Sequence, residues 1–369
     1  MTAGAVTSVC GEVSPASLGV TTMHEHTLFD LTMLAAAHGA GHFTPPAHLL
    51  TLEPENLAFL RGGAGLFSPS CRIVDDTDYL AGELAAFRTV GGGTVLDATP
   101  LGARGDVTKI AAASRATGVN VVVATGVYCV GQRPPEIASL DEDDLVAYLL
   151  RELTDGIEDT GIKPGIVKAA QSATGTDGRI HPDERLSIRA CARAAAEAGL
   201  SLHVHTSFPL TADHVTAAID LIVDEVGLPA DRLVMLHLDS LLRPATAGLG
   251  YLRSLGTEKG VSIDAPLAAL DRGVTVSFDS WGSFLDTPGY ALPDDNDRMK
   301  GLFALVERGY AEQLVVGHDI ANRACGAQHG GYGFRRVVEL LPATLALLGR
   351  PEAAQTILVD NPARILARH

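Results

Sequence analysis

The sequence predicts an α/β protein that folds as a (β/α)8 TIM barrel, in which eight parallel strands each lead into a helix. Short apolar runs alternate with helical patterns along the whole chain, and we count eight such runs. The runs are continuously apolar, as expected for parallel strands that are buried on both faces. A β–α unit repeated eight times with right-handed crossovers closes into a barrel. A large doubly wound open sheet is the alternative architecture.

The predicted strands are short β-rich runs. They follow residues 1–20, which we expect to form a β-hairpin-like lead-in, and we assign residues 1–369 to one barrel domain. In chain order the strands are Thr21–His26, Thr94–Ala98, Val119–Thr125, Gly165–Lys168, Leu200–His205, Leu233–His237, Val274–Phe278 and Leu314–His318.

The segments between the strands show helical periodicity. Asp78–Val90 places Leu80, Leu84 and Phe87 on one face. Pro182–Ala198 begins with Pro-Asp-Glu and stops before a glycine that suits a helix C-cap. The other predicted helices are Asp106–Thr117, Asp141–Asp159, Thr211–Val226, Asp295–Arg308 and Phe334–Leu348.

Two connections are unusually long. Leu31–Thr77 follows the first strand and Leu238–Asp271 follows the sixth, so both lie at the carboxyl face of a barrel, where active sites form. Long loops without clear structure are often functional. Within the second connection, Leu241–Asp264 is an insertion that we expect to shape a pocket.

Composition narrows the class of partner. The chain has 28 basic and 44 acidic residues in 369, a net charge of −16, which argues against binding to nucleic acid or to anionic membranes. Five cysteines without C-x-x-C spacing do not suit a disulfide framework or a zinc ribbon, so we expect a reducing cytoplasm. We predict neither a signal peptide nor a membrane span, because no apolar stretch reaches about 18 residues.

Side chains that can bind metal ions stand at the ends of five predicted strands. Strand alternation places His24 and His26 on one face, and His203 and His205 likewise share a face. Each such residue alone is more readily a satisfied core histidine or a helix cap. Because five strands each deliver one at the carboxyl end, we interpret the set as a metal site. Its members are His24, His26, Lys168, His203, His205, His237 and Asp319.

Lys168 ends an apolar run, where a charged group is costly to bury. It can extend its ammonium group to water or pair with a carboxylate. Alternatively, burial lowers its pKa, and the neutral amine reacts with carbon dioxide. The carbamate that forms is an anionic oxygen ligand able to bridge two cations.

Several motifs in the same order resemble those of the phosphotriesterase family, in the amidohydrolase superfamily. Within this family the chain resembles the phosphotriesterase-like lactonases and the phosphotriesterase-related proteins. The similarity covers nearly the whole chain, from Gly11 to Arg364. Its motifs are LGVTTMHEH at residues 18–26, GGGTVLDATP at 91–100, TGVN at 117–120, ATGVY at 124–128, GGYG at 330–333 and Asn361-Pro362.

The resemblance implies a site for two divalent metal ions. His24, His26 and Asp319 would hold the more buried ion. The more exposed ion would bind His205 and His237, with N6-carboxylated Lys168 and a hydroxide as bridges. Zinc suits the nitrogen-rich ligands, and Mn, Co or Fe are alternatives. His203 matches no family ligand and is interpreted as a supporting or packing residue.

The implied reaction is hydrolysis. Two metal ions lower the pKa of the bridging water, the hydroxide attacks the substrate, and Asp319 takes its proton.

Many family members carry an aspartate three residues after the histidine of the sixth strand. Here Ser240 takes that place and Asp239 precedes it, which puts a proton-shuttle role there in doubt.

Substrate contacts are predicted at three positions. Tyr128 stands where lactonase-like members have tyrosine and organophosphate specialists have tryptophan, although it could simply be an aromatic wall. Arg323 could bind an anionic substrate end, or it could form a surface salt bridge. Trp281 could line the cleft or a subunit contact.

The leading functional hypothesis is hydrolysis of a lactone or carboxylic ester, a small-molecule substrate. An amide hydrolase for an N-acylated anionic compound comes next, and a phosphotriesterase third. A catalytically silent metal- or ligand-binding barrel is the alternative outside enzymes. The family resemblance also implies a homodimer.

Overall fold

The computed structural model describes residues 4–30, 45–172, 179–206, 210–243, 260–283, 292–320 and 322–369. Within these residues, eight parallel strands form one sheet in the order β10-β9-β8-β7-β6-β5-β4-β3. The strands are β3 (Val20–Glu25), β4 (Gly92–Asp97), β5 (Asn120–Gly126), β6 (Ile166–Gln171), β7 (Leu202–Thr206), β8 (Leu233–Met235), β9 (Thr275–Phe278) and β10 (Leu314–Val316).

The first and last strands of this sheet come together just beyond β10. The backbone amides of His318 and Asp319 both donate to the carbonyl of His24, at 3.2 and 3.0 Å. The sheet is therefore a nearly closed barrel, which confirms the predicted (β/α)8 architecture and all eight predicted strands.

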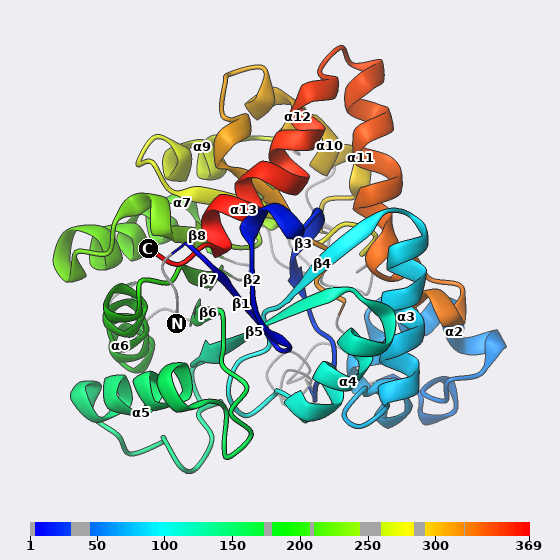
Figure 1. Cartoon of the computed structure of the whole chain (residues 1–369). Coiled ribbons are helices and arrows are strands. Elements are labelled where there is room, and N and C mark those ends of the chain that lie inside the picture. The colour runs from blue at the N-terminus through cyan, green and yellow to red at the C-terminus, as the bar shows by residue number, and fades with distance from the viewer. Residues whose placement is uncertain are drawn as a thin grey trace.

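Helices surround the strands, as Figure 1 shows. The structure confirms each predicted helix, with shifts of a few residues at the ends. Their bounds are α3 (Thr77–Thr89), α4 (Val107–Thr117), α5 (Glu142–Asp155), α6 (Pro182–Ala198), α7 (Ala212–Ile219), which continues as a π-helical turn (Asp220–Val226), α10 (Asp295–Val306) and α11 (Arg336–Leu347).

Some helices differ from prediction. Helix α5 ends at Asp155 rather than at the predicted Asp159, because the chain turns at Gly156, which has a φ of 111°. The connection after β8 contains α9 (Asp264–Leu270), which was predicted as loop. Seven residues with a proline in the first turn are too short a stretch to show helical periodicity.

Other short helices lie in the connections and at the C-terminus. The connection before α3 holds α2 (Leu57–Arg61), and the chain ends in α12 (Pro351–Gln355), a π-helical turn (Thr356–Asp360) and α13 (Asn361–Leu366). Residues 31–44 of the first long connection and 244–259 of the second lie outside the described residues.

The interior of the barrel is apolar on the amino side of the polar residues at the carboxyl ends of the strands. There, inward-facing side chains of six strands pack with residues of the lead-in and of α13; they are Val6, Leu18, Met23, Leu96, Val122, Ala124, Ile166, Val234, Leu236, Val315, Ile365 and Leu366. The lead-in contains an antiparallel pair, β1 (Val6–Ser8) and β2 (Gly11–Val13), which lies across the barrel in Figure 1. The Val9 amide ties it to the Val121 carbonyl of β5 at 2.9 Å.

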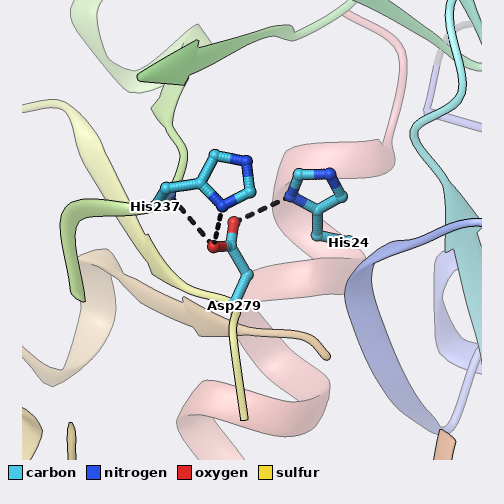
Figure 2. A group of neighbouring side chains, drawn as sticks. All are labelled: His24, His237 and Asp279. Atoms are coloured by element: carbon cyan, nitrogen blue, oxygen red, sulfur yellow. Dashed lines mark hydrogen bonds and ion pairs between the residues drawn. The ribbon is translucent and has the colours of Figure 1, made fainter. Parts of the chain in front are cut away.

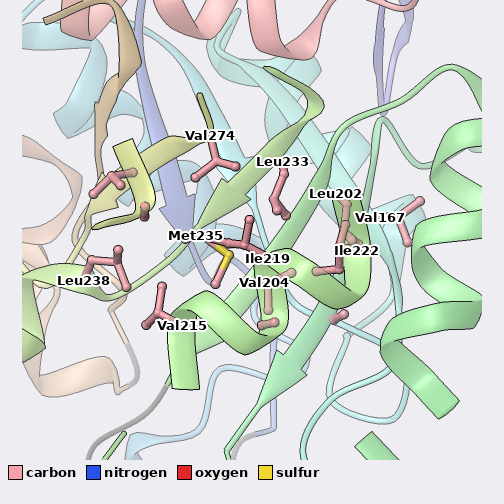
Figure 3. Close-up of a cluster of buried hydrophobic side chains, with 14 of the residues drawn as sticks. Val167, Leu202, Val204, Val215, Ile219, Ile222, Leu233, Met235, Leu238 and Val274 are labelled. Atoms are coloured by element: carbon pink, nitrogen blue, oxygen red, sulfur yellow. The ribbon is translucent and has the colours of Figure 1, made fainter. Parts of the chain in front are cut away.

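The outer faces of the strands pack on the helices. Around α7, side chains from β6 to β9 interdigitate with those of the helix, and Figure 3 shows Val204 and Met235 beside Val215 and Ile219. This packing fixes the positions of the strand ends that carry the polar residues. In the described part of the chain, no helix is long and apolar enough to cross a membrane.

Candidate metal centre

The polar residues predicted from the strand ends converge at the carboxyl end of the barrel. The Nε2 atom of His24 lies 3.2 Å from Nζ of Lys168 and 3.6 Å from Oδ1 of Asp319. Nε2 of His26 is 3.0 Å from the same Asp319 oxygen. His24, His26 and Asp319 thus offer three ligand atoms within 4.8 Å of one another, and this group can hold a metal ion.

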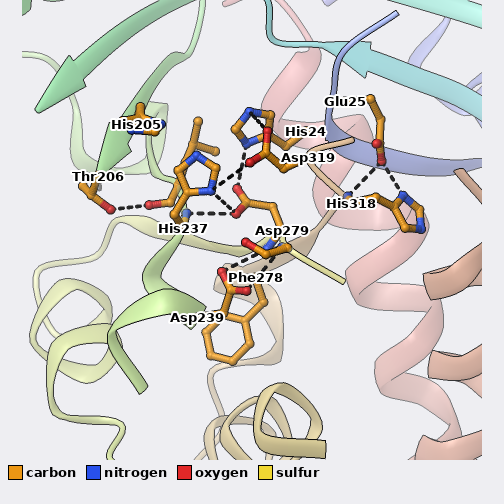
Figure 4. Close-up of polar contacts among 12 residues, drawn as sticks. His24, Glu25, His205, Thr206, His237, Asp239, Phe278, Asp279, His318 and Asp319 are labelled. Carbon is orange, nitrogen blue, oxygen red and sulfur yellow. Dashed lines mark hydrogen bonds and ion pairs between the residues drawn. The ribbon is translucent and has the colours of Figure 1, made fainter. Parts of the chain in front are cut away.

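A second group of histidines adjoins the first. The rings of His24 and His237 have their centroids 4.7 Å apart, and those of His205 and His237 are 4.5 Å apart. Nδ1 of His237 is 3.9 Å from Oδ2 of Asp319. All six residues predicted as metal ligands therefore lie in one cluster (Figure 4 labels four of them), and the structure contains two buried His/Asp groups consistent with a binuclear metal centre.

The backbone brings these residues close through two glycines. A Cβ atom on Gly126 would lie 1.8 Å from the carbonyl oxygen of Lys168, so β5 can pass against Lys168 only with glycine there. A Cβ on Gly317 would lie 2.6 Å from the carbonyl of His24. Both glycines allow the close approach of strands that the cluster requires.

Two of the cluster residues adopt a left-handed backbone conformation, which is uncommon for residues other than glycine. The φ angle is 59° at His237 and 50° at Asp319. The hydroxyl of Ser240 donates to the carbonyl of His237 at 2.6 Å, which holds this turn. Next to Asp319, His318 donates from Nδ1 to the Glu25 carboxylate at 2.5 Å. Such conformations persist at functional sites where the surroundings determine them.

Asp279, which follows β9, accepts hydrogen bonds from two of the histidines. Nδ1 of His24 lies 2.9 Å from Oδ2, and Nδ1 of His237 lies 2.8 Å from Oδ1 (Figure 2). Burial alone would raise the pKa of Asp279, but His237 and His24 hold it well below its usual range. An ionised carboxylate only accepts hydrogen bonds, so both Nδ1 atoms carry a proton.

His24, His237 and Asp279 also meet the geometric requirement for a metal group. We assign Asp279 as a hydrogen-bond acceptor rather than a ligand, because its oxygens face Nδ1–H groups. With Nδ1 bonded to Asp279, Nε2 is the atom of each ring that can bind a cation, as in the carboxylate–histidine–metal arrangement. Sequence reasoning missed Asp279; its position directly after the seventh strand, like that of Asp319 after the eighth, was the available signal.

His26 is oriented in a similar way by a different carboxylate. Its Nδ1 lies 2.7 Å from the hydroxyl of Thr99, and that hydroxyl donates to Asp97. Asp97 also accepts from the amide of Thr99 at 3.0 Å. The donor set therefore fits a pair of divalent cations: nitrogen and carboxylate ligands with their outer atoms fixed by hydrogen bonds.

Lys168 is 1% exposed, and burial lowers its pKa to about 8 even though Asp319 and Asp279 act in the opposite direction. A lysine whose pKa is lowered in this way offers more of the neutral amine that reacts with carbon dioxide.

His203 lies on β7 and is the register partner of Lys168 on β6. Nε2 of His203 contacts the Ser201 hydroxyl at 3.1 Å, and its buried Nδ1 has no hydrogen-bond partner among the described residues.

The predicted substrate contacts fall in three different environments. The Tyr128 hydroxyl lies 3.3 Å from Nδ1 of His205, at the cluster. Arg323 pairs with Asp76 at 2.5 Å, and its guanidinium lies 4.6 Å from the centroid of the Tyr79 ring. Trp281 is 1% exposed in the core, where its indole donates to the Phe278 carbonyl at 3.0 Å. Of the three, only Tyr128 has a described contact with the cluster; substrate roles for Arg323 and Trp281 stay predictions.

Comparison with known proteins agrees with this geometry. The human N-acetyltaurine hydrolase is 26% identical over 97% of each chain. A crystal structure of a resiniferatoxin-binding protein from Rhodobacter sphaeroides matches with a TM-score of 0.81 at 25% identity, covering 98% of this chain and 95% of that one. A mutant of a phosphotriesterase-like lactonase from Deinococcus radiodurans matches with a TM-score of 0.70 at 25% identity, covering 98% and 99%.

The model of the Phosphotriesterase family matches residues 4–366, nearly the whole chain. The same span contains the barrel, the two histidine groups and every predicted ligand. This chain belongs to the phosphotriesterase family.

Proposed function

We propose that this protein is a metal-dependent hydrolase that attacks a carbonyl carbon, with a lactone or a carboxylic ester as its substrate. The observation that carries the proposal is the buried cluster of His24, His26, His205, His237, Lys168 and Asp319, with the Tyr128 hydroxyl beside it. A lysine buried among histidines is costly unless it binds something charged. Two divalent cations provide that charge.

We assign His24, His26 and Asp319 to one cation and His205 and His237 to the other. Lys168, carboxylated at Nζ, would be shared by both. Zinc suits this donor set. When bound, such a pair of cations lowers the pKa of a water molecule and polarises a carbonyl oxygen.

Asp319 is placed to take a proton from the attacking water. Its side chain is 29% exposed, unlike the fully buried Asp279, so a proton on it can leave toward solvent. Burial alone would raise the pKa of Asp319, but His24 and His237 lower it to about 2. The carboxylate therefore stays ionised and able to accept a proton at neutral pH.

Tyr128 is placed to act on the substrate oxygen. Burial raises the pKa of its hydroxyl well above the usual value, so the group keeps its proton. A protonated hydroxyl beside His205 can donate a hydrogen bond to a carbonyl or a leaving alkoxide. Such a donor suits ester or lactone cleavage.

Hydrolysis of an N-acylated anionic compound is the second candidate. It is supported by the similarity to human N-acetyltaurine hydrolase, whose name gives that substrate. An anionic substrate end needs a cation, and the predicted one, Arg323, is already paired with Asp76. A neutral ester or lactone needs no such cation, and this favours the first candidate.

Metal analysis and a substrate panel test the proposal together. Protein purified after metal-replete growth should hold about two divalent ions per chain, as two-metal sites do. Lactones and carboxylic esters should give a higher kcat/KM than N-acyl amino acids, N-acyl sulfonates or phosphotriesters. A preference for the N-acylated anions would select the second candidate. Absence of bound metal after metal-replete growth would refute both.

A further inference from the structure

The carboxylate of Asp279 accepts three hydrogen bonds from His24 and His237, which are far apart in the sequence. Its Oδ2 accepts from Nδ1 of His24, which lies on β3, 255 residues away. Its Oδ1 accepts from both Nδ1 and the backbone amide of His237, at 2.8 and 3.0 Å. The carboxylate is fully buried. Each of its oxygens therefore orients a different imidazole (Figure 2).

In the ligand assignment proposed above, these two histidines belong to different halves of the cluster. His24 is assigned to the ion held with His26 and Asp319, and His237 is assigned to the other ion with His205, against whose ring it packs. By contrast, the Thr99 hydroxyl contacts the ring of one histidine, His26. Among the described contacts, Asp279 therefore hydrogen-bonds to a histidine of each half of the cluster, whereas Thr99 contacts a histidine of one half.

A second buried carboxylate holds Asp279 in place. Asp239 accepts hydrogen bonds from the backbone amides of Asp279 and Ser280, both at 3.2 Å. Its Oδ2 also accepts from Nε of Arg298, on α10, at 2.7 Å. Asp239 and Arg298 are both fully buried. Figure 4 shows Asp239 below Asp279 in this arrangement.

We propose that Asp279 is a positioning residue for both halves of the metal centre, fixing the Nδ1–H tautomer of His24 and of His237, and that Arg298 supports it through Asp239. The part that concerns metal binding rests on the proposed function. The orientation of the two rings is a property of the chain itself.

The shared carboxylate has a consequence for metal loading. Hydrogen-bond partners behind a ligating histidine change metal affinity by about 10–100-fold. Since Asp279 stands behind one histidine of each half, its loss should weaken both sites. Fixing one ring also fixes the carboxylate that orients the other, so the two sites should bind cooperatively.

Asp279→Asn is the variant that tests the shared role. An asparagine side chain has one acceptor oxygen and one donor NH2, so it cannot accept from both Nδ1–H groups. Thr99→Val is the matched control, because it removes the side-chain partner of His26 alone. Both variants keep side-chain volume, and circular dichroism and thermal unfolding of the metal-free protein check that they fold.

Two measurements read out the result. The first is a titration in which metal-free protein and a chelator compete for Zn²⁺. It gives the affinity of the protein for the first and for the second equivalent of Zn²⁺. Asp279→Asn should weaken both equivalents by about 10–100-fold, and Thr99→Val should weaken one. The second is the ¹⁵N spectrum of histidine-labelled, metal-free protein. His24 and His237 should be Nδ1–H tautomers in the natural protein, and at least one should change in Asp279→Asn.

The outcomes separate this inference from the proposed function. If Asp279→Asn weakens a single equivalent, as Thr99→Val does, the shared role is wrong. If tautomers and affinities are both unchanged, the whole inference is overturned. If the natural protein binds no Zn²⁺ yet its tautomers respond to Asp279→Asn, the proposed function and the metal part fail, while the positioning of both rings stands.

Discussion

At the amino end of the barrel, Leu18, Val122 and Ile166 pack into an apolar cluster, whereas at the carboxyl end Lys168 and Asp279 fill an interior that is just as buried. Burying a large apolar side chain contributes about 1.5–3 kcal/mol. Burying an ion costs several kcal/mol unless it is paired. The amino end therefore stabilises the strands, and the carboxyl end uses that stability to hold costly groups.

The pairing at the carboxyl end is extensive. Glu25 binds His318, Asp97 is bonded to Thr99, and Arg298 compensates Asp239. These contacts hold the strand ends that carry the ligands. Substitutions at the two ends should therefore have different effects. At the amino end they should change the free energy of unfolding without changing catalytic activity, and at the carboxyl end they should change metal binding and catalytic activity.

The largest effect is expected for Lys168→Ala. Removing the shared ligand should abolish metal binding. The expected loss of kcat/KM is larger than that for removal of one general acid or base, which contributes about 10²–10⁴-fold. Short-chain carboxylates should restore part of the activity, because they can occupy the space of the carbamate. Lys109→Ala, at an exposed lysine paired with Asp75, is the control. Full activity in Lys168→Ala would exclude the shared-ligand assignment.

Arg298→Met should lower the free energy of unfolding by about 3–5 kcal/mol, because it leaves Asp239 buried without its cation. Adding Asp239→Asn should recover much of that loss in urea unfolding. Arg308→Met, at an exposed arginine just after α10, should have little effect. An unchanged unfolding midpoint for Arg298→Met would show that the buried pair is not needed.

At the apolar end, Leu18→Ala should lower the free energy of unfolding by about 2–5 kcal/mol through the lost contacts and the cavity. Metal content and kcat/KM of the folded protein should stay at the values of the natural protein. Urea unfolding and steady-state kinetics on the same sample make the comparison. A loss of metal affinity comparable to the loss of stability would mean that the two ends are not separable.

The smallest effect is expected for Arg323→Met. The ion pair of Arg323 with Asp76 is partly exposed, and such pairs contribute about 1 kcal/mol or less. Because the guanidinium is engaged there, kcat/KM for esters should hardly change. A selective rise in KM for N-acylated anions, with esters unaffected, would instead place Arg323 at the substrate and favour the second candidate function.

The sequence alone was sufficient for the barrel. Continuous apolar runs reflect strands buried on both faces, and this pattern depends only on local order. Sequence periodicity did not predict α9, because seven residues carry too little of it. It also misplaced the end of α5, where Gly156 turns the chain. Alternation along a single strand also placed His24 with His26, because side chains two positions apart share a face, and position at the carboxyl ends of strands identified Lys168, His237 and Asp319.

What only the tertiary structure decided is which side chains meet across the barrel. The contact between His24 and Asp279 spans 255 residues, and that between Arg298 and Asp239 spans 59. The pairing of Arg323 with Asp76 likewise joins positions 247 apart. Periodicity specifies the face on which a side chain lies. Its partner is set by the register and closure of all eight strands, which no local segment encodes.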